Sequence, residues 1–71
     1  MKIHFNELFI YSNGKITPLV PVQIGGVSIS PGATMNDEIQ INGISIKQIT
    51  NHFLEVISEN AIYRINGVYP N

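Results

Sequence analysis

A short pattern recurs three times in the 71-residue chain: an aliphatic residue, an Asn or Gly, a Gly, and a second aliphatic residue. Asn-Gly and Gly-Gly pairs tolerate the positive φ angles that two-residue type I′ hairpin turns require. Each copy is therefore predicted to form a tight turn, and the flanks of the first two copies alternate as short strands do. The copies are Ile24–Val27, Ile41–Ile44 and Ile65–Val68, and Asn13-Gly14 is expected to close a further hairpin.

The apolar residues favour strands over helices. Thirteen Ile and five Val dominate them, and β-branched side chains pack well on a pleated sheet but lose rotamer freedom in a helix. The run Lys2–Tyr11 is predicted to be a strand. Its apolar residues change face at Asn6-Glu7, which indicates a β-bulge there. Residues 61–69 also have strand character, with Ile62 and Arg64 on one face.

Two prolines interrupt the segment after the first hairpin. Pro18 and Pro21 have no backbone N–H to donate to a sheet, so residues 16–21 are expected at a sheet edge or in a crossing segment. Residues 30–37 are rich in turn-forming residues and are predicted to be the longest clear loop.

One segment has a helical rather than an alternating pattern. Its apolar residues recur at helical spacing: Ile46, Ile49, Phe53, Val56 and Ile57. Ser45 followed by Gln48 fits a capping box, and Asn60 suits the left-handed conformation that ends a helix. The adjacent pairs Phe53-Leu54 and Val56-Ile57 break strand alternation. An amphipathic helix over residues 46–59 is therefore predicted.

Together these elements predict a small α+β fold. It consists of a mostly antiparallel sheet built from tight hairpins, with the helix of residues 46–59 packed on one face. A small all-β barrel is the alternative. Residues 1–71 are expected to form one domain, since a chain of this length is at the lower end of domain sizes.

A domain of this size buries a thin core and commonly needs additional stabilisation. The chain has no cysteine, which excludes disulfides. Residues are 44% hydrophobic and only 13% charged, and a surface poor in charge tolerates contact with another chain. A homo-oligomer is therefore expected.

Charge and hydropathy argue against two classes of partner. The net charge is −1 with four cationic side chains, which disfavours an extended surface for nucleic acid. The chain contains no apolar run as long as the roughly 20 residues of a membrane span, and its start lacks the apolar stretch of a signal peptide. A cytoplasmic protein is expected.

The sequence predicts neither a catalytic nor a metal-binding site. His4 and His52 lack the spacing and partners of zinc ligands. Asp37-Glu38 are neighbours in the chain, and a Glu55/Glu59 pair on one helix face would normally be solvated. The glycine pairs are not followed by the residues of a phosphate-binding loop. The chain is therefore predicted to be no enzyme and to hold no cofactor.

One segment resembles part of a known family. The stretch Asn36–Ile46, with Ile39-Gln40-Ile41-Asn42-Gly43 at its centre, is followed by Thr50 and a predicted helix that carries Leu54, Val56 and Ile57. It resembles the second half of PDZ domains, which often have Gly-Asp-x-Ile-x-x-Ile-Asn-Gly before the helix that flanks the bound peptide. The resemblance implies peptide binding. Asn36 replaces the usual Gly, and the chain upstream is too short for the intervening strand and small helix of that family.

The function that these features favour is a small, non-enzymatic protein-interaction module. Its size suits an inhibitor or accessory protein of a compact genome, such as a phage protein that blocks a host defence system. Alternatives are a structural subunit of a homo-oligomeric assembly, a PDZ-like peptide-binding domain, and a domain that binds a small ligand such as a nucleotide at a subunit interface. The residues predicted to contact a partner protein are Pro18, Pro21, Met35, Asn36, Asp37, Tyr63, Arg64 and Tyr69.

Overall fold

The computed structural model describes residues 1–70, which form short strands and two single-turn helices. In chain order the elements are β1 (Lys2–His4), α1 (Phe5–Leu8), β2 (Phe9–Ser12), β3 (Lys15–Pro18), β4 (Val22–Ile24), β5 (Val27–Ile29), β6 (Met35–Asn36), β7 (Gln40–Ile41), β8 (Ile44–Ser45), α2 (Ile46–Ile49), β9 (Phe53–Glu59) and β10 (Ile62–Val68). Within residues 1–70 no helix has the length and apolar character needed to cross a membrane.

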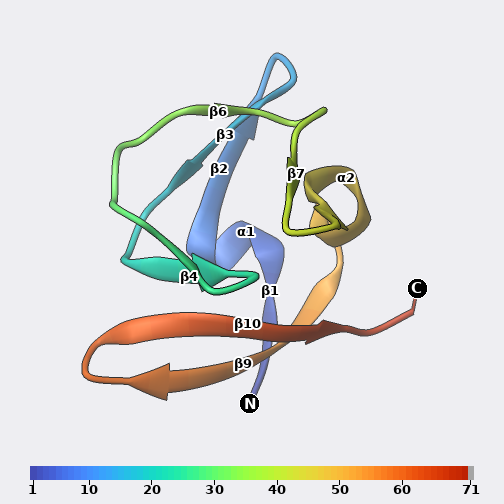
Figure 1. The fold of residues 1–71 in the computed structure, drawn as a ribbon. Helices are drawn as coiled ribbons and strands as arrows, with labels where there is room; N and C mark the ends of the chain where they lie inside the picture. The colour runs from blue at the N-terminus through green and yellow to red at the C-terminus, as the bar shows by residue number, and fades with distance from the viewer. Residues whose placement is uncertain (71) are drawn as a thin grey trace.

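The largest sheet has five strands in the order β1-β9-β10-β4-β5. β10 pairs with β4 in parallel, and the other pairs are antiparallel. β2, β3 and β6 form a second sheet, and β7 pairs with β8. The predicted α+β class is confirmed. The alternative of a closed barrel is wrong for the described part of the chain, because each sheet is open (Figure 1).

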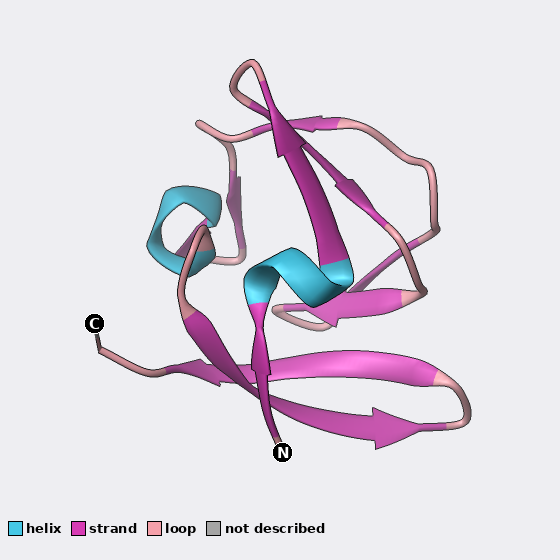
Figure 2. Ribbon diagram, turned by 180° about the vertical axis from the view of Figure 1, so that it is seen from behind, coloured by secondary structure: helices cyan, strands magenta, loops and turns pink. Residues whose placement is uncertain are grey.

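The core lies on one side of the five-stranded sheet. Figures 1 and 2 show β9 and β10 along the bottom of the molecule, with both helices and the smaller sheets above them. The buried apolar residues come from nearly every element: Phe5, Leu8, Phe9, Ile16, Val22, Ile24, Ile46, Ile49, Leu54 and Val56. The opposite side of the sheet contributes none of them.

Three of the predicted tight turns are confirmed. Asn13-Gly14 joins β2 to β3, Gly25-Gly26 joins β4 to β5, and Asn42-Gly43 joins β7 to β8. All six residues have positive φ, between 49° and 83°. This is the conformation that type I′ turns require.

The fourth predicted turn, Asn66-Gly67, is wrong. It lies inside β10, where Ile65 pairs with Val56 and Gly67 pairs with Glu55. Asn66 is therefore the extra residue of a β-bulge. The turn between β9 and β10 is Asn60-Ala61, with φ angles of 53° and 65°, so the left-handed Asn60 closes a hairpin and does not end a helix.

The predicted helix over residues 46–59 is also wrong beyond its first turn. α2 ends at Ile49, Ser45 makes no side-chain cap, and Asn51 has a φ of 58° that turns the chain away. β9 follows, with Leu54 and Val56 in the core. The PDZ-like interpretation loses the helix on which its peptide groove depends.

A helical turn also replaces the bulge predicted near Asn6-Glu7. His4 Nδ1 accepts a hydrogen bond from the Asn6 amide at 3.1 Å, and a Glu7 carboxylate oxygen accepts one from the His4 amide at 3.2 Å. These bonds cap α1. The helix turns the chain so that Phe5, Leu8 and Phe9 all enter the core.

Residues 16–21 were predicted to lie at a sheet edge or in a crossing segment. This is wrong for β3 and confirmed for the residues between β3 and β4. β3 is the central strand of its sheet, and Pro18 is fully buried. β6 pairs only with Lys15 and Ile16, so Pro18 lies beyond that ladder. Residues 19–21 then cross to β4.

The turn between β4 and β5 provides a matched pair of glycine substitutions. A Cβ on Gly25 would lie 3.0 Å from the Ile41 carbonyl oxygen, whereas a Cβ on Gly26 would meet no atom within 4 Å. Gly26→Ala is expected to lower the free energy of unfolding by about 1–2 kcal/mol through its positive φ alone. Gly25→Ala should lower it further. Equal urea midpoints for the two variants would contradict this packing of the turn.

Candidate functional site

The side of the five-stranded sheet that faces away from the core is the candidate site, here called the outer face. The register places alternate residues of each strand on it. They are Lys2 and His4 of β1, Phe53, Glu55, Ile57 and Glu59 of β9, Ile62 and Arg64 of β10, Gln23 of β4 and Ser28 of β5. Phe53 and Ile57 are 45% and 36% exposed, although both are large apolar residues.

An aromatic cluster lies where β1 and β9 meet the end of β10. The His4 and Phe53 rings pack edge to face with centres 4.7 Å apart. Lys2 Nζ lies 5.1 Å from the centre of the Phe53 ring and 4.7 Å from that of Tyr69. A cation over an aromatic ring stabilises such an arrangement. The cluster is therefore ordered without a partner, which lowers the entropy lost on binding.

Glu55 anchors the aromatic cluster at its edge. One carboxylate oxygen accepts a hydrogen bond from the Tyr69 hydroxyl, and the other lies 2.7 Å from the Met1 amine. The amine is the main reason that the pKa of Glu55 is lowered, and the Tyr69 hydroxyl adds to the effect. The same hydrogen bond raises the pKa of Tyr69.

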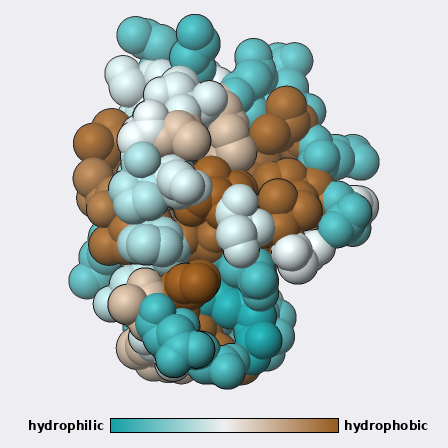
Figure 3. All heavy atoms as spheres, turned by 60° about the vertical axis from the view of Figure 1, so that its left-hand side comes forward, coloured by the Kyte–Doolittle hydropathy of each residue, from teal (hydrophilic) through white to brown (hydrophobic). Residues whose placement is uncertain are grey.

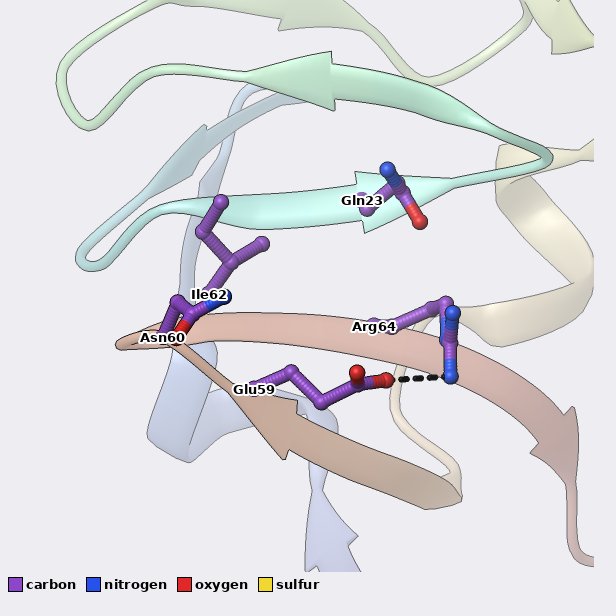
Figure 4. A pocket seen from close by; sticks show the side chains of 5 residues that line it. All are labelled: Gln23, Glu59, Asn60, Ile62 and Arg64. Carbon is purple, nitrogen blue, oxygen red and sulfur yellow. Dashed lines mark hydrogen bonds and ion pairs between the residues drawn. The ribbon is translucent and has the colours of Figure 1, made fainter.

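A shallow, open pocket of about 170 Å³ lies at the other end of the outer face. Figure 4 shows its lining side chains on β4, β10 and the hairpin between β9 and β10: Gln23, Glu59, Asn60, Ile62 and Arg64. Arg64 Nη2 donates to a Glu59 carboxylate oxygen at 2.5 Å. The pocket is smaller than the roughly 300–1,000 Å³ of most small-molecule sites, and its size suits one side chain of a partner.

The structure places two of the eight predicted contact residues at this site, Arg64 and Tyr69. Tyr63 lies next to Arg64 in the chain but on the core side, where it packs against buried residues. Pro18 is buried and Met35 is half-buried against the core. These positions separate Tyr63, Pro18 and Met35 from the outer face.

The remaining predicted residues, Pro21, Asn36 and Asp37, make hydrogen bonds within the chain. The Pro21 carbonyl accepts a hydrogen bond from the Tyr63 amide at 2.9 Å, which extends the parallel pairing of β4 and β10. The Asn36 side chain accepts one from the Glu38 amide at 2.8 Å. Asp37 is only 7% exposed and accepts one from the Tyr11 hydroxyl at 2.5 Å. Asp37 thereby ties the 30–37 loop to the first hairpin.

Sequence reasoning missed most of the outer face, above all Phe53, Ile57 and Gln23. A signal was present. Apolar residues on both sides of a strand remove the alternation that identifies strands. When only one of these sides faces the core, the second apolar side is exposed and can contact a partner. The adjacent apolar pairs of residues 53–57 were that signal.

The described residues contain no group of three or more His, Asp or Glu side chains that could hold a metal ion. No protein-family model, curated protein or solved structure matches the chain. The geometry of the outer face is therefore the main indication of function.

The two tyrosine–carboxylate pairs predict a loss of stability at alkaline pH. The hydrogen bond to Asp37 raises the pKa of Tyr11, and that to Glu55 raises the pKa of Tyr69, both above the ordinary value of 10.0. Folding therefore favours the protonated hydroxyls. This stabilisation is complete below about pH 10 and is lost as the pH rises through the folded-state pKa values.

The corresponding measurement is urea denaturation between neutral and alkaline pH. The variant Tyr11→Phe/Tyr69→Phe is expected to lose less stability across this range than the wild type. Tyr63→Phe serves as the control, since no hydrogen bond joins its hydroxyl to either carboxylate among the described contacts. An unchanged pH profile in the double variant would contradict the role of the two pairs.

Proposed function

We propose that the protein is a non-enzymatic protein-interaction module that binds its partner on the outer face. The observation that supports this most is a pair of large apolar side chains, Phe53 and Ile57, exposed on the uncovered side of a sheet whose other side is the core. Aromatic residues and arginine dominate the binding energy of protein interfaces, and Phe53, Tyr69 and Arg64 are of these types.

The charges of the outer face favour a protein over a nucleic acid. Arg64 is paired with Glu59, and Lys2 lies over the rings of Phe53 and Tyr69. Neither cation is free to follow a phosphate backbone. A surface that alternates apolar side chains with paired charges resembles the mixed composition of protein interfaces.

The tyrosine–carboxylate pairs do not support catalysis. A general base is most effective when its pKa lies near the working pH. The pKa of Tyr11 and of Tyr69 moves away from neutrality instead. These side chains are therefore proposed to be structural.

Affinity capture with matched variants tests the proposal. Wild-type chain, Phe53→Ser/Arg64→Ala and Ile10→Ser would be immobilised and exposed to bacterial lysate. Ile10 is 53% exposed on β2 and lies outside the outer face, so its variant is the control. A partner retained by the wild type and the control but lost at least tenfold by the double variant is the expected result. Equal retention by all three would overturn the proposal.

The small size of the chain supports a proposal about what it does to its partner. A small chain that covers a partner's surface suits an inhibitor or accessory protein, including a phage protein directed at a host defence system, and we propose this role. It is tested by adding the purified chain to the captured partner and measuring that partner's activity. Inhibition by the wild type that Phe53→Ser/Arg64→Ala lacks is expected.

A further inference from the structure

β5 is the terminal strand of the five-stranded sheet, and it pairs only with β4. The two-residue turn makes Ile24 and Val27 the first hydrogen-bonded pair of the hairpin. Hydrogen-bonded and non-hydrogen-bonded pairs alternate along an antiparallel ladder, so the N–H and C=O of Ser28 point away from β4. None of the backbone hydrogen bonds found outside the strand ladders of residues 1–70 involves Val27–Ile29.

This edge lacks the charged residues that commonly prevent strands from pairing between molecules. Proteins commonly place charged residues, especially Lys, on exposed edge strands. No charged residue occurs between Ile16 and Asn36, a segment that includes β4 and β5. The opposite edge, β1, carries Lys2 and the polar His4. In the view of Figure 3, apolar side chains are exposed across the middle of the molecule and hydrophilic ones gather at its top and bottom.

The sequence of β5 is complementary to itself. If two copies pair antiparallel about Ser28, each Ser28 exchanges two hydrogen bonds with the other, and Val27 of one copy lies opposite Ile29 of the second. Val27 and Ile29 lie on the core side of the sheet, because they pair with the buried Ile24 and Val22. Val27 is 43% exposed in one chain, and the second copy would cover it.

We propose that β5 is a homodimer edge, at which two chains join their five-stranded sheets about a two-fold axis through the Ser28 pair. Pro31 has no N–H to donate and limits the paired segment to residues before it. So short an edge buries little surface, and interfaces below about 1,200 Å² in total belong to weak complexes. The dimer is therefore expected to form reversibly with rising concentration. The outer faces of both copies remain free for the partner proposed above.

Sedimentation equilibrium over a wide concentration range tests the proposal. The wild type is expected to shift from one-chain to two-chain mass and no further. Val27→Lys should raise the dissociation constant at least tenfold, because it places two cations at the paired edge. Leu19→Lys is the control, since Leu19 is 48% exposed in the crossing segment outside β5.

A chain synthesised with N-methyl-Ser28 separates edge pairing from other causes. The modification removes a donor that the folded chain does not use, so the circular dichroism spectrum should be preserved while the dimer is lost. A monomer at every concentration, a mass that rises beyond two chains, or an unchanged dissociation constant in Val27→Lys or N-methyl-Ser28 would each overturn the proposal. Phe53→Ser, on the outer face, should dimerise normally, which separates this result from failure of the proposed function.

Discussion

Phe5→Ala is expected to remove a large part of the protein's stability. Phe5 is fully buried, and its ring stacks on Phe9 with centres 4.7 Å apart. Truncating a buried Phe to Ala costs about 3–5 kcal/mol, since the apolar contacts are lost and a cavity remains. A domain of this length has a total stability of about 4–11 kcal/mol. The loss is therefore a large part of the total, and far-ultraviolet circular dichroism with urea denaturation would measure it.

Phe5→Leu is the control for this experiment. It keeps most of the apolar volume and should cost about half as much or less, since volume-conserving substitutions in cores are tolerated best. If Phe5→Ala kept the urea midpoint of the wild type, α1 would not hold Phe5 in the core.

Leu54→Ala and Phe53→Ala are expected to differ sharply although the residues are neighbours. Leu54 is fully buried, and its loss should lower the free energy of unfolding by about 2–5 kcal/mol. Phe53 is 45% exposed on the outer face, and its removal should cost about 1 kcal/mol or less. Urea denaturation of the two variants, with Val56→Ala as a second core position, measures the difference.

The reverse result would favour a different structure. In a helix over residues 46–59, Phe53 and Ile57 would lie on the buried stripe, and their removal would be the more damaging. A large loss of stability in Phe53→Ala with little effect in Leu54→Ala would therefore contradict the strand β9.

The tight turns could be predicted because their chemistry is local. A two-residue turn with positive φ at both positions selects Gly and Asn whatever the rest of the chain does, and this held at Asn13-Gly14, Gly25-Gly26 and Asn42-Gly43. The same residues fit a β-bulge. Only the pairing of β9 with β10 places Asn66 in a strand and moves the turn to Asn60-Ala61.

The segment after Ile49 could not be predicted from its own pattern. Helical spacing extends from Ile46 to Ile57, but Asn51 breaks the helix and the sheet pairing on both sides of β9 stabilises a strand. Of these two partner strands, β1 lies at the start of the chain and β10 follows β9. Tertiary pairing of this kind overrides local preference.

The candidate site was predicted least well. Arg64 and Tyr69 could be selected by residue type, but Gln23, Phe53 and Ile62 join them only through the strand order β9-β10-β4. Asp37 was predicted to contact a partner, and its burial beside Tyr11 depends on the contact between the 30–37 loop and the first hairpin. Neither arrangement is encoded in a local stretch of sequence.

The strand order of the five-stranded sheet also bears on how quickly the chain can fold. Its central strands, β9 and β10, come last in the chain, whereas their outer neighbours, β1 and β4, come early. To form this sheet, Lys2 must pair with Glu55, and Val22 must pair with Tyr63. Pairing across such separations requires the entropy of closing long loops to be lost before contacts form, which slows folding. During synthesis, β1 and the β4–β5 hairpin therefore have no sheet partner until the ribosome has released the β9–β10 hairpin.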